Sequence, residues 1–384
     1  KNKEREIADF KPERYWNVFS IINGAEYKHP EDIFEKSELE KFKGIKKALA
    51  ETKKKEEKIL PPHPFDLTAL QREAYRLHKM TPSKTLQIAQ KLYLGGLISY
   101  PRTSSQKIPD STAPKEILKK LQKHFPEVKL ASRPKPIEGS KSDPAHPSIY
   151  PTGEYAELEE DDLKLYNIIL KRFISVFCPD AITENTRVIL TTDNGIKFTA
   201  SGLKILDKGW TQVYPAELKE EKVQELSGEV KIDEIKTIEK ETQPPKRYTP
   251  TSLVTILEKK NLGTKSTRSM IIDTLFERGY LDGKSIKATP LGIKLIESLE
   301  KYSSIIIDEN LTRQLEEEME KIQESKSGFK EKEASLIKKA KKIIEDISKE
   351  FKSKESQIGK ELAEGIINLR KEQAESSELV ECPK

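Results

Sequence analysis

Residues 85–103 read Thr-Leu-Gln-Ile-Ala-Gln-Lys-Leu-Tyr-Leu-Gly-Gly-Leu-Ile-Ser-Tyr-Pro-Arg-Thr. Apolar residues recur at helical spacing from Leu86 to Leu94, which predicts an amphipathic helix. Gly95-Gly96 ends this helix, because glycine adopts the left-handed backbone without strain. Residues 97–100 are short, mostly apolar and partly β-branched, and they predict a strand after the helix.

The residues upstream of this stretch complete a recognisable unit. Apolar spacing over residues 67–77 predicts another helix, and Thr81-Pro82-Ser83 predicts a turn with an N-terminal cap. Helix, turn, helix and strand is typical of a winged-helix domain. A second such unit is predicted from helices over 251–259 and 268–277 and a strand at Gly279-Tyr280-Leu281. Two units of this kind in one chain favour nucleic-acid binding.

Strands are predicted on both sides of the first unit. Residues 15–22 alternate and end on Asn23-Gly24, which suits a hairpin turn because both residues tolerate positive φ. Residues 187–191 and 197–201 flank Asp193-Asn194-Gly195, and further short alternating runs follow. We expect this later section to complete a sheet begun by residues 15–22, so that the β-rich domain is discontinuous in sequence.

The remaining stretches are predicted mostly as helix or loop. Residues 39–58 are charged and helix-forming, and Pro61-Pro62-His63-Pro64 stops any helix there. Apolar spacing predicts a helix over 161–177, whereas the Pro/Ser/Lys-rich residues 129–148 predict a loop. Residues 311–375 predict a charged helical tail, which is either a solvated helix with many ion pairs or an arm for DNA or a partner.

Composition limits the class of protein. The 384 residues are too many for one ordinary core and favour two or three domains. Lys and Arg total 69 against 64 for Asp and Glu, so the net charge of +5 permits nucleic acid without requiring it. Only Cys178 and Cys382 are present, which favours a reducing compartment. No apolar run reaches the roughly 20 residues of a membrane span, so we expect a cytoplasmic protein.

Tyr100 and Arg102 form a chemically coherent pair. Pro101 favours extended backbone at Tyr100, and in extended backbone residues two apart point to the same face. A free phenol has a pKa of about 10 and needs help with its proton, while the guanidinium fork suits a phosphate that gains charge during transfer. The alternative is a half-buried Tyr beside a surface Arg, the usual fate of such a tripeptide.

Residues 85–93 and 96–103 closely resemble the active-site segment of type IA DNA topoisomerases. The resemblance implies that Tyr100 is the nucleophile that takes the 5′ phosphate and that Arg102 positions this phosphate. By the same resemblance, Gln90 and Thr103 are expected to contact DNA. The family usually continues Arg-Thr-Asp-Ser, whereas this chain has Ser at position 104, a change that suits the archaeal, topoisomerase I/III-like branch.

His146 lies in a second matching segment. Residues 145–152 resemble the family's His-x-Ala-Ile-x-Pro-Thr element, in which the His contacts the region of the scissile phosphate. The imidazole could donate a hydrogen bond to a phosphate oxygen or relay a proton, and both roles stay open. The alternative is a loop His without function.

Residues 248–253 and 263–280 resemble the family's single-strand-binding domain. The start of a helix offers backbone N–H groups to phosphate, and nearby cations add charge. The alternative is simple capping of that helix by Ser266 or Thr267. The family more often has Gly-Arg-Pro-Ser-Thr, so Lys265 replaces a proline. The residues predicted to bind DNA here are Lys265, Ser266, Thr267, Arg268 and Arg278.

Metal ligands are expected to lie outside this chain. The family holds Mg²⁺ on the acidic residues of an N-terminal Toprim domain, including an Asp-x-Asp pair, and no Asp-x-Asp occurs here. Asp161-Asp162 is better explained as the charged start of a helix. Cys382-Pro383-Lys384 resembles the opening of a zinc ribbon, but one Cys cannot hold Zn²⁺, so zinc is expected only in a longer protein.

The resemblance implies a multidomain α+β chain in which a β-rich arch joins two winged-helix (CAP-like) domains in a toroidal, ring-shaped core. The predicted segments are 1–64 (first part of the arch and linker), 65–182 (winged-helix domain carrying Tyr100), 183–245 (second part of the arch), 246–328 (second winged-helix domain, for single-stranded DNA) and 329–384 (charged helical tail).

The implied function is cleavage of one DNA strand through a 5′-phosphotyrosine, strand passage and religation, which relaxes negative supercoils without ATP. The implied partners are single-stranded or underwound DNA, the Toprim domain and, as a candidate, a helicase; we expect a monomer at the nucleoid. Without the Toprim domain, the chain is expected to bind DNA with little or no relaxation.

Three other classes of protein are alternatives to a type IA topoisomerase core. A catalytically incomplete winged-helix fragment that binds single-stranded DNA and the topoisomerase part of a reverse gyrase both stay open. The order of residues argues against a tyrosine recombinase or type IB enzyme. That group places Arg, Lys and His before a late Tyr, whereas Tyr100 precedes His146 here.

Overall fold

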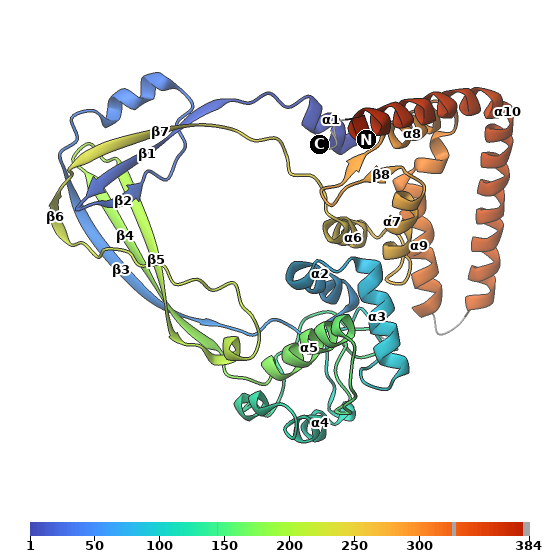
Figure 1. Cartoon of the computed structure of the whole chain (residues 1–384), viewed down its shortest axis with the longest axis horizontal. Coiled ribbons are helices and arrows are strands. Elements are labelled where there is room, and N and C mark those ends of the chain that lie inside the picture. Colours follow the sequence, from blue (N-terminus) through green and yellow to red (C-terminus); the bar gives the residue numbers. More distant parts are fainter. Residues whose placement is uncertain (144, 325–327, 379–384) are drawn as a thin grey trace, which may run out of the picture.

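The computed structural model describes residues 1–143, 145–324 and 328–378, and its ribbon follows a ring (Figure 1). A curled sheet lies on one side of the ring. The helices between residues 67 and 175 (α2–α5, the first helical group) and those from residue 250 onward (α6–α10, the second helical group) lie on the other. The short helix α1 (Asn2–Ala8) lies against the second helical group, where Lys1 pairs with Glu300.

One seven-stranded antiparallel sheet, the curled sheet, is built from two separate parts of the chain. At one edge of the sheet the first strand pairs with the last, from Arg14↔Glu241 to Ile21↔Glu234. This confirms that the later β-rich section completes the sheet begun by residues 15–22. In spatial order the strands are β6 (Gly228–Lys231), β3 (Lys47–Ile59), β4 (Ala181–Thr192), β5 (Lys197–Asp207), β2 (Ala25–Lys28), β1 (Arg14–Ile22) and β7 (Glu234–Glu241).

The predicted hairpin is confirmed, but the predicted helix over 39–58 is wrong. Asn23 and Gly24 turn between β1 and β2 with φ of 49° and 78°. Residues 39–58 instead form the end of a 3₁₀ helix, η1 (Lys36–Phe42), and most of β3. Strand β3 pairs with β4 from Ala48 to Ile59 and buries Ala48 and Ala50 on one face. Backbone pairing along this length overrides the helix propensity of its Lys and Glu residues.

The first helical group confirms the two helices predicted upstream of Tyr100. Asp66 caps its first helix by accepting from the Ala69 N–H at 2.7 Å, and Thr81 caps the second by accepting from the Lys84 N–H at 3.3 Å. The group consists of α2 (Leu67–His78), α3 (Pro82–Leu94), η2 (Asp110–Thr112), α4 (Pro114–Leu121), η3 (Pro126–Leu130) and α5 (Glu160–Ser175).

Two buried contacts join the curled sheet to the first helical group. The short helix η4 (Gly209–Gln212) follows β5, and its Trp210 donates an indole hydrogen bond to the Ile59 carbonyl at 2.8 Å. The guanidinium of Arg172, on α5, lies between the rings of Phe65 and Tyr214, 4.1 and 4.3 Å from their centroids. The helical group is therefore held to both connections that lead to the sheet.

Residues 97–100 do not form the predicted strand. Ile98 makes only an isolated antiparallel bridge to Pro151. The pairing does not extend, because the Tyr150 N–H donates to the Ser99 hydroxyl at 3.0 Å in place of the next backbone bond of a ladder. The segment is nevertheless held in an extended path by this bridge and its neighbouring hydrogen bonds.

The second helical group also begins with the two predicted helices. The strand predicted at residues 279–281 is found at Leu281–Asp282, where it pairs with a second short strand that the sequence did not predict. The group consists of α6 (Pro250–Lys259), α7 (Arg268–Glu277), β8 (Leu281–Asp282), β9 (Lys287–Ala288), α8 (Pro290–Tyr302), η5 (Ser304–Ile307), α9 (Glu309–Glu324) and α10 (Phe329–Glu378). The charged tail is thus two helices, and α10 bends so that its last part runs beside α8 (Figure 1). Ile358 is 2% exposed there, so this part of the tail is packed and not a solvated helix.

The predictions for Cys382, for a membrane span and for the domain boundaries have different outcomes. Cys382 lies outside the described residues. Among the helices that the structure describes, none combines the length and apolarity that crossing a membrane requires. The domain boundaries drawn from the sequence stay predictions.

Candidate functional site

The segment that carries Tyr100 is fastened to residues 148–152. The Ser99 N–H donates to the Tyr150 carbonyl at 2.9 Å, and its hydroxyl donates to the Ser148 carbonyl at 3.0 Å. The Thr152 N–H donates to the Leu97 carbonyl at 3.0 Å. These bonds fix the register between the two segments, so Tyr100 is presented toward the loop that contains His146.

Tyr100 lies within an aromatic group. Its ring centroid is 4.5 Å from that of His146, with an interplanar angle of 48°. Tyr93, from the last turn of α3, approaches the Tyr100 ring edge-on at 5.3 Å. Tyr100 and His146 are both half-buried, so the rings are held in place while remaining accessible. The structure therefore brings together the predicted nucleophile and the predicted histidine.

Arg102 reaches across to the second helical group. Its Nη1 donates a hydrogen bond to the Ser266 carbonyl at 3.3 Å. This contact places the loop of residues 263–267, which the sequence predicts to bind DNA, beside the segment that carries Tyr100. We call Tyr100, Arg102 and His146 the Tyr100 site.

Thr103 is more deeply buried than the other predicted DNA contacts. Thr103 is 1% exposed; its hydroxyl donates to the His146 carbonyl at 3.4 Å and accepts from the Ser105 N–H at 3.0 Å. Its carbonyl accepts from the Leu67 N–H at 3.0 Å. Thr103 thus joins the start of α2, its own segment and the His146 loop. Gln90 is half-buried on α3.

The start of α7 differs from the predicted capping. No side-chain hydrogen bond caps α7, so the expectation that Ser266 or Thr267 caps it is wrong. The Thr267 hydroxyl instead accepts from the Thr264 N–H at 3.0 Å, which closes the loop on itself. Arg268 donates through Nε to the Leu262 carbonyl at 3.1 Å, and burial lowers the pKa of its guanidinium.

Arg278 lies at the opposite end of α7 from this loop. The helix has 10 residues, so at 1.5 Å per residue Arg278 lies roughly 15 Å along the axis from the start of α7. Its side chain is exposed. The structure therefore separates Arg278 from the Tyr100 site, while Lys265 and Ser266 lie next to it.

Asp143 is a residue of this region that the sequence did not single out. Its Oδ1 accepts from the N–H groups of Ala145 at 3.0 Å and His146 at 3.3 Å. Its Oδ2 accepts from the Ser104 N–H at 3.2 Å and hydroxyl at 3.1 Å, and it is paired with Lys265. The short Asp-to-backbone bonds could have been expected from an Asp before a loop His. The pairing with Lys265 could not, because 122 residues separate the two.

The carboxyl of Asp143 is ionised by its surroundings. Burial on its own raises the pKa of a carboxyl group, but the bonds from Lys265 and from the N–H groups of Ala145 and Ser104 outweigh it. The net result is a pKa for Asp143 well below its usual range. A fixed negative charge thus lies directly beneath the His146 loop.

A second charged contact closes the two helical groups on each other. Lys141 pairs with Glu258 on α6 and lies 3.7 Å from Asp66, the cap of α2. Together with the Lys265–Asp143 pair and the Arg102–Ser266 bond, it makes the boundary near Tyr100 polar. Polar contacts of this kind suit surfaces that separate and close again.

No metal centre is formed by the residues in view. Within 1–143, 145–324 and 328–378, no three His, Cys, Asp or Glu side chains gather as a metal ion requires. Asp143, which holds the backbone of the His146 loop, is engaged by Lys265. These residues do not fit Mg²⁺.

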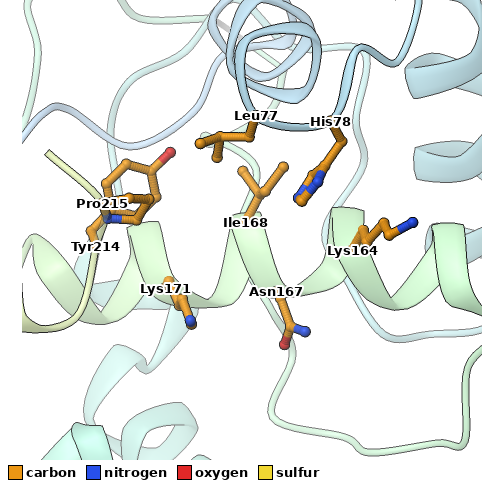
Figure 2. Close-up of a pocket in the computed structure, with 8 residues that line it drawn as sticks. All are labelled: Leu77, His78, Lys164, Asn167, Ile168, Lys171, Tyr214 and Pro215. Carbon is orange, nitrogen blue, oxygen red and sulfur yellow. The ribbon is translucent and has the colours of Figure 1, made fainter. Parts of the chain in front are cut away.

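A hollow of the first helical group is separate from the Tyr100 site. It measures about 260 Å³ and lies between α2, α5 and the segment after η4 (Figure 2). Figure 2 shows Ile168 pointing from α5 toward Leu77 and His78 of α2, with Lys164 and Lys171 to either side along α5. None of its lining residues belongs to the Tyr100 site.

Comparisons with known proteins identify relatives of the whole chain. A family profile described as DNA topoisomerase matches residues 1–334. The chain is 40% identical over 407 residues to DNA topoisomerase 1 of Pyrococcus horikoshii, covering 100% of this chain and 58% of that protein. It is 40% identical over 403 residues to DNA topoisomerase 1 of Methanocaldococcus jannaschii, covering 100% of this chain and 52% of that protein.

The fold is shared with a solved structure. Full-length topoisomerase I from Thermotoga maritima matches with a TM-score of 0.72 and 28% identity, over 89% of this chain and 60% of that chain. The chain spans about half the length of the curated relatives it matches. Since the profile covers most of the chain, with the Tyr100 segment inside it, the chain belongs to the type IA DNA topoisomerase family.

Proposed function

We propose that this chain is the core of a topoisomerase that cleaves one strand of DNA through Tyr100. The observation that carries the proposal is the Tyr100–His146 ring contact at 4.5 Å, held on two fastened segments beside Arg102. A phenol with an imidazole next to it and a guanidinium nearby has the groups that phosphoryl transfer requires: a nucleophile, a hydrogen-bonding partner and a fixed positive charge.

The proposed step exchanges one phosphodiester for another. The Tyr100 oxygen attacks phosphorus, a Tyr–O–P bond to the 5′ side forms, and the bond from phosphorus to the 3′ oxygen breaks. The phenol gives up its proton and the departing 3′ oxygen takes one up. Arg102 stabilises the charge on the phosphate, and His146 either donates to a phosphate oxygen or relays the proton. Religation is the reverse reaction, so no ATP is required.

The ring in Figure 1 supports strand passage as the use of this reaction. The proposal assigns the curled sheet to a flexible arch and the two helical groups to winged-helix domains that part and close around DNA. Opening at their polar boundary admits a second strand, and closing it allows religation. Relaxation of negative supercoils follows, with single-stranded or underwound DNA as substrate and Mg²⁺ supplied by a Toprim domain.

A covalent-adduct assay tests the nucleophile. The chain is incubated with labelled single-stranded DNA, a separately made Toprim domain and Mg²⁺, and is then denatured. We expect a covalent adduct on the 5′ phosphate that Tyr100→Phe abolishes, because no other oxygen replaces the phenol. Tyr93→Phe is the matched control, since that ring lies 5.3 Å from Tyr100. An adduct that survives Tyr100→Phe, or one on the 3′ phosphate, refutes the proposal.

A second candidate function is non-catalytic binding of single-stranded DNA. The observation that favours it is that Arg102 and Lys265, two cations able to bind phosphate without any chemistry, lie together at the boundary between the helical groups. In this case the chain binds the oligonucleotide with and without the Toprim domain and never forms an adduct. The same assay therefore separates the two functions.

A further inference from the structure

We propose that Asp143 is a positioning residue for the Tyr100 site, and that Lys265 leaves Asp143 for a DNA phosphate when substrate binds. The inference rests on the proposed function and adds a residue and an exchange of partners to it. It begins from the contacts of one carboxylate, whose two oxygens accept from three different parts of the chain.

The first step concerns the two segments that Asp143 joins. Its Oδ1 holds the N–H of His146 itself, and its Oδ2 holds the N–H and hydroxyl of Ser104, two residues after Arg102. The Tyr100–His146 contact depends on the register of these same segments. Asp143 therefore fixes the imidazole relative to the phenol from beneath, although it touches neither ring in the contacts observed.

The second step concerns burial. The Asp143 side chain is 2% exposed, and a buried carboxylate is costly unless charged and hydrogen-bonding groups surround it. Without Lys265 it still accepts four hydrogen bonds from Ser104, Ala145 and His146. The carboxylate can therefore keep its place when the lysine leaves.

The third step concerns what the lysine can do after leaving. Lys265 belongs to the second helical group and is 36% exposed in its side chain. It is followed by Ser266, whose carbonyl holds Arg102. In the closed ring both cations are thus occupied by protein oxygens. A phosphate entering between the groups offers oxygens to both cations, and charge-assisted bonds to phosphate are strong enough to replace these contacts.

Asp143→Asn should raise the affinity for DNA but lower the rate of adduct formation. In Asp143→Asn, Lys265 loses its charged partner and is free for phosphate, so affinity for a short single-stranded oligonucleotide should rise by roughly threefold, within the range of one ion pair. The rate of adduct formation should fall about tenfold or more, because the amide has one acceptor oxygen and can no longer hold both the Ser104 N–H and the N–H groups of Ala145 and His146. General damage to the fold would lower both quantities.

The control isolates the lysine. Glu258→Gln removes the same charge from the neighbouring pair with Lys141 at the same boundary, and should leave affinity within the error of the measurement. In Asp143→Asn with Lys265→Met the gain in affinity should vanish, as a double-mutant cycle requires when one residue acts through the other. Affinity is measured by fluorescence anisotropy of a labelled oligonucleotide over a range of salt.

Each outcome decides the matter. Equal affinity of Asp143→Asn and wild type, or a gain that persists without Lys265, refutes the exchange of partners. Adduct formation at the wild-type rate in Asp143→Asn refutes the positioning role. If Asp143→Asn does not fold, Lys265→Met tests the exchange alone: affinity should fall and the slope of log affinity against log salt should lessen by about 0.7.

Absence of adduct in the wild type would refute the proposed function instead. The affinity measurements would still test the exchange of partners.

Discussion

At the scale of single residues, Arg102 has one partner in the closed ring, the Ser266 carbonyl, and a different proposed partner, a phosphate, when DNA is bound. Its hydrogen bond to the Ser266 carbonyl, 3.3 Å long, joins two parts of the chain that are 164 residues apart. The backbone carbonyl is a neutral acceptor, so a charged phosphate can displace it. The sequence predicts Arg102 as a phosphate ligand, and its partner in the closed ring is what the sequence could not supply.

Removal of this guanidinium should affect chemistry more than binding. In Arg102→Ala, we expect adduct formation to fall by about 10²- to 10³-fold, the usual effect of losing one group that stabilises a developing charge. Affinity for the oligonucleotide should change by less than about fivefold, because other cations still contact the backbone. Adduct rate and anisotropy are measured on the same preparations. Equal losses in both would show that Arg102 only binds DNA.

At the scale of elements, the sequence predicted most helices but not all strands. The helices over 67–77 and 86–94 were predictable because their apolar residues recur at helical spacing and Thr81 marks a cap. Strand β3 was missed because Lys and Glu dominate it and its partners come from residues 181–192 and 228–231. Pairing between distant segments leaves no local signal when both faces of a strand are polar.

The candidate site shows the same division. Tyr100 and His146 were predicted from local motifs, and the structure brings their rings together. Asp143 was missed because its role depends on Ser104 and Lys265, which the fold alone brings to it. Capping by Thr267 was predicted from residue type, but the hydroxyl bonds to Thr264 instead. Sequence motifs thus predict which chemical groups form the site. Which distant residues contact these groups could be found only from the structure.

The contact of α8 with α10 should depend on pH through Glu361. Hydrogen bonds from Ser298, Lys301 and Tyr302 lower the pKa of Glu361 to about 2 from an ordinary value of 4.5. A carboxyl whose pKa is lower in the folded than in the unfolded protein stabilises the folded state at pH values above the unfolded-state pKa. This stabilisation is lost as pH falls toward 2.

The expected result concerns the difference in melting temperature between wild type and Glu361→Gln. The variant should melt lower at pH 7, and the difference should shrink steadily as pH falls below about 4.5. Glu364→Gln is the matched control, because Glu364 is on the same helix and makes one longer contact of 3.5 Å to Lys294. It should shift melting less. A difference that stays constant with pH would contradict the role of the ionised Glu361.

At the scale of the whole molecule, the ring is closed near Tyr100 largely by charge. The pairs Lys141–Glu258 and Lys265–Asp143 both cross from one helical group to the other. The junction of the first helical group with the curled sheet is instead buried and partly aromatic, as at Arg172. A boundary of ions and a junction of packed rings differ in their response to salt, so the boundary between the groups is the place where the ring should open.

Opening should therefore be driven by salt and mimicked by removing the two lysines. Fluorophores on Leu94→Cys, in α3, and Met270→Cys, in α7, report the separation of the groups, since both positions are exposed. Cys382→Ser removes the cysteine that lies outside the described residues, and Cys178 is buried. Energy transfer should fall as salt rises from about 0.1 to 1 M, because the screening length shortens from roughly 10 to 3 Å.

The variant Lys141→Met with Lys265→Met should show low transfer even at low salt, because neither ion pair can form between the helical groups. Lys91→Met is the control: it removes a pair with Asp162 that lies within the first helical group and should leave the salt profile unchanged. The opposite result is energy transfer that is independent of salt in the wild type and equal in the double variant. It would mean that apolar packing between α2, α3, α6 and α7 closes the ring and that the charged contacts contribute nothing to closure.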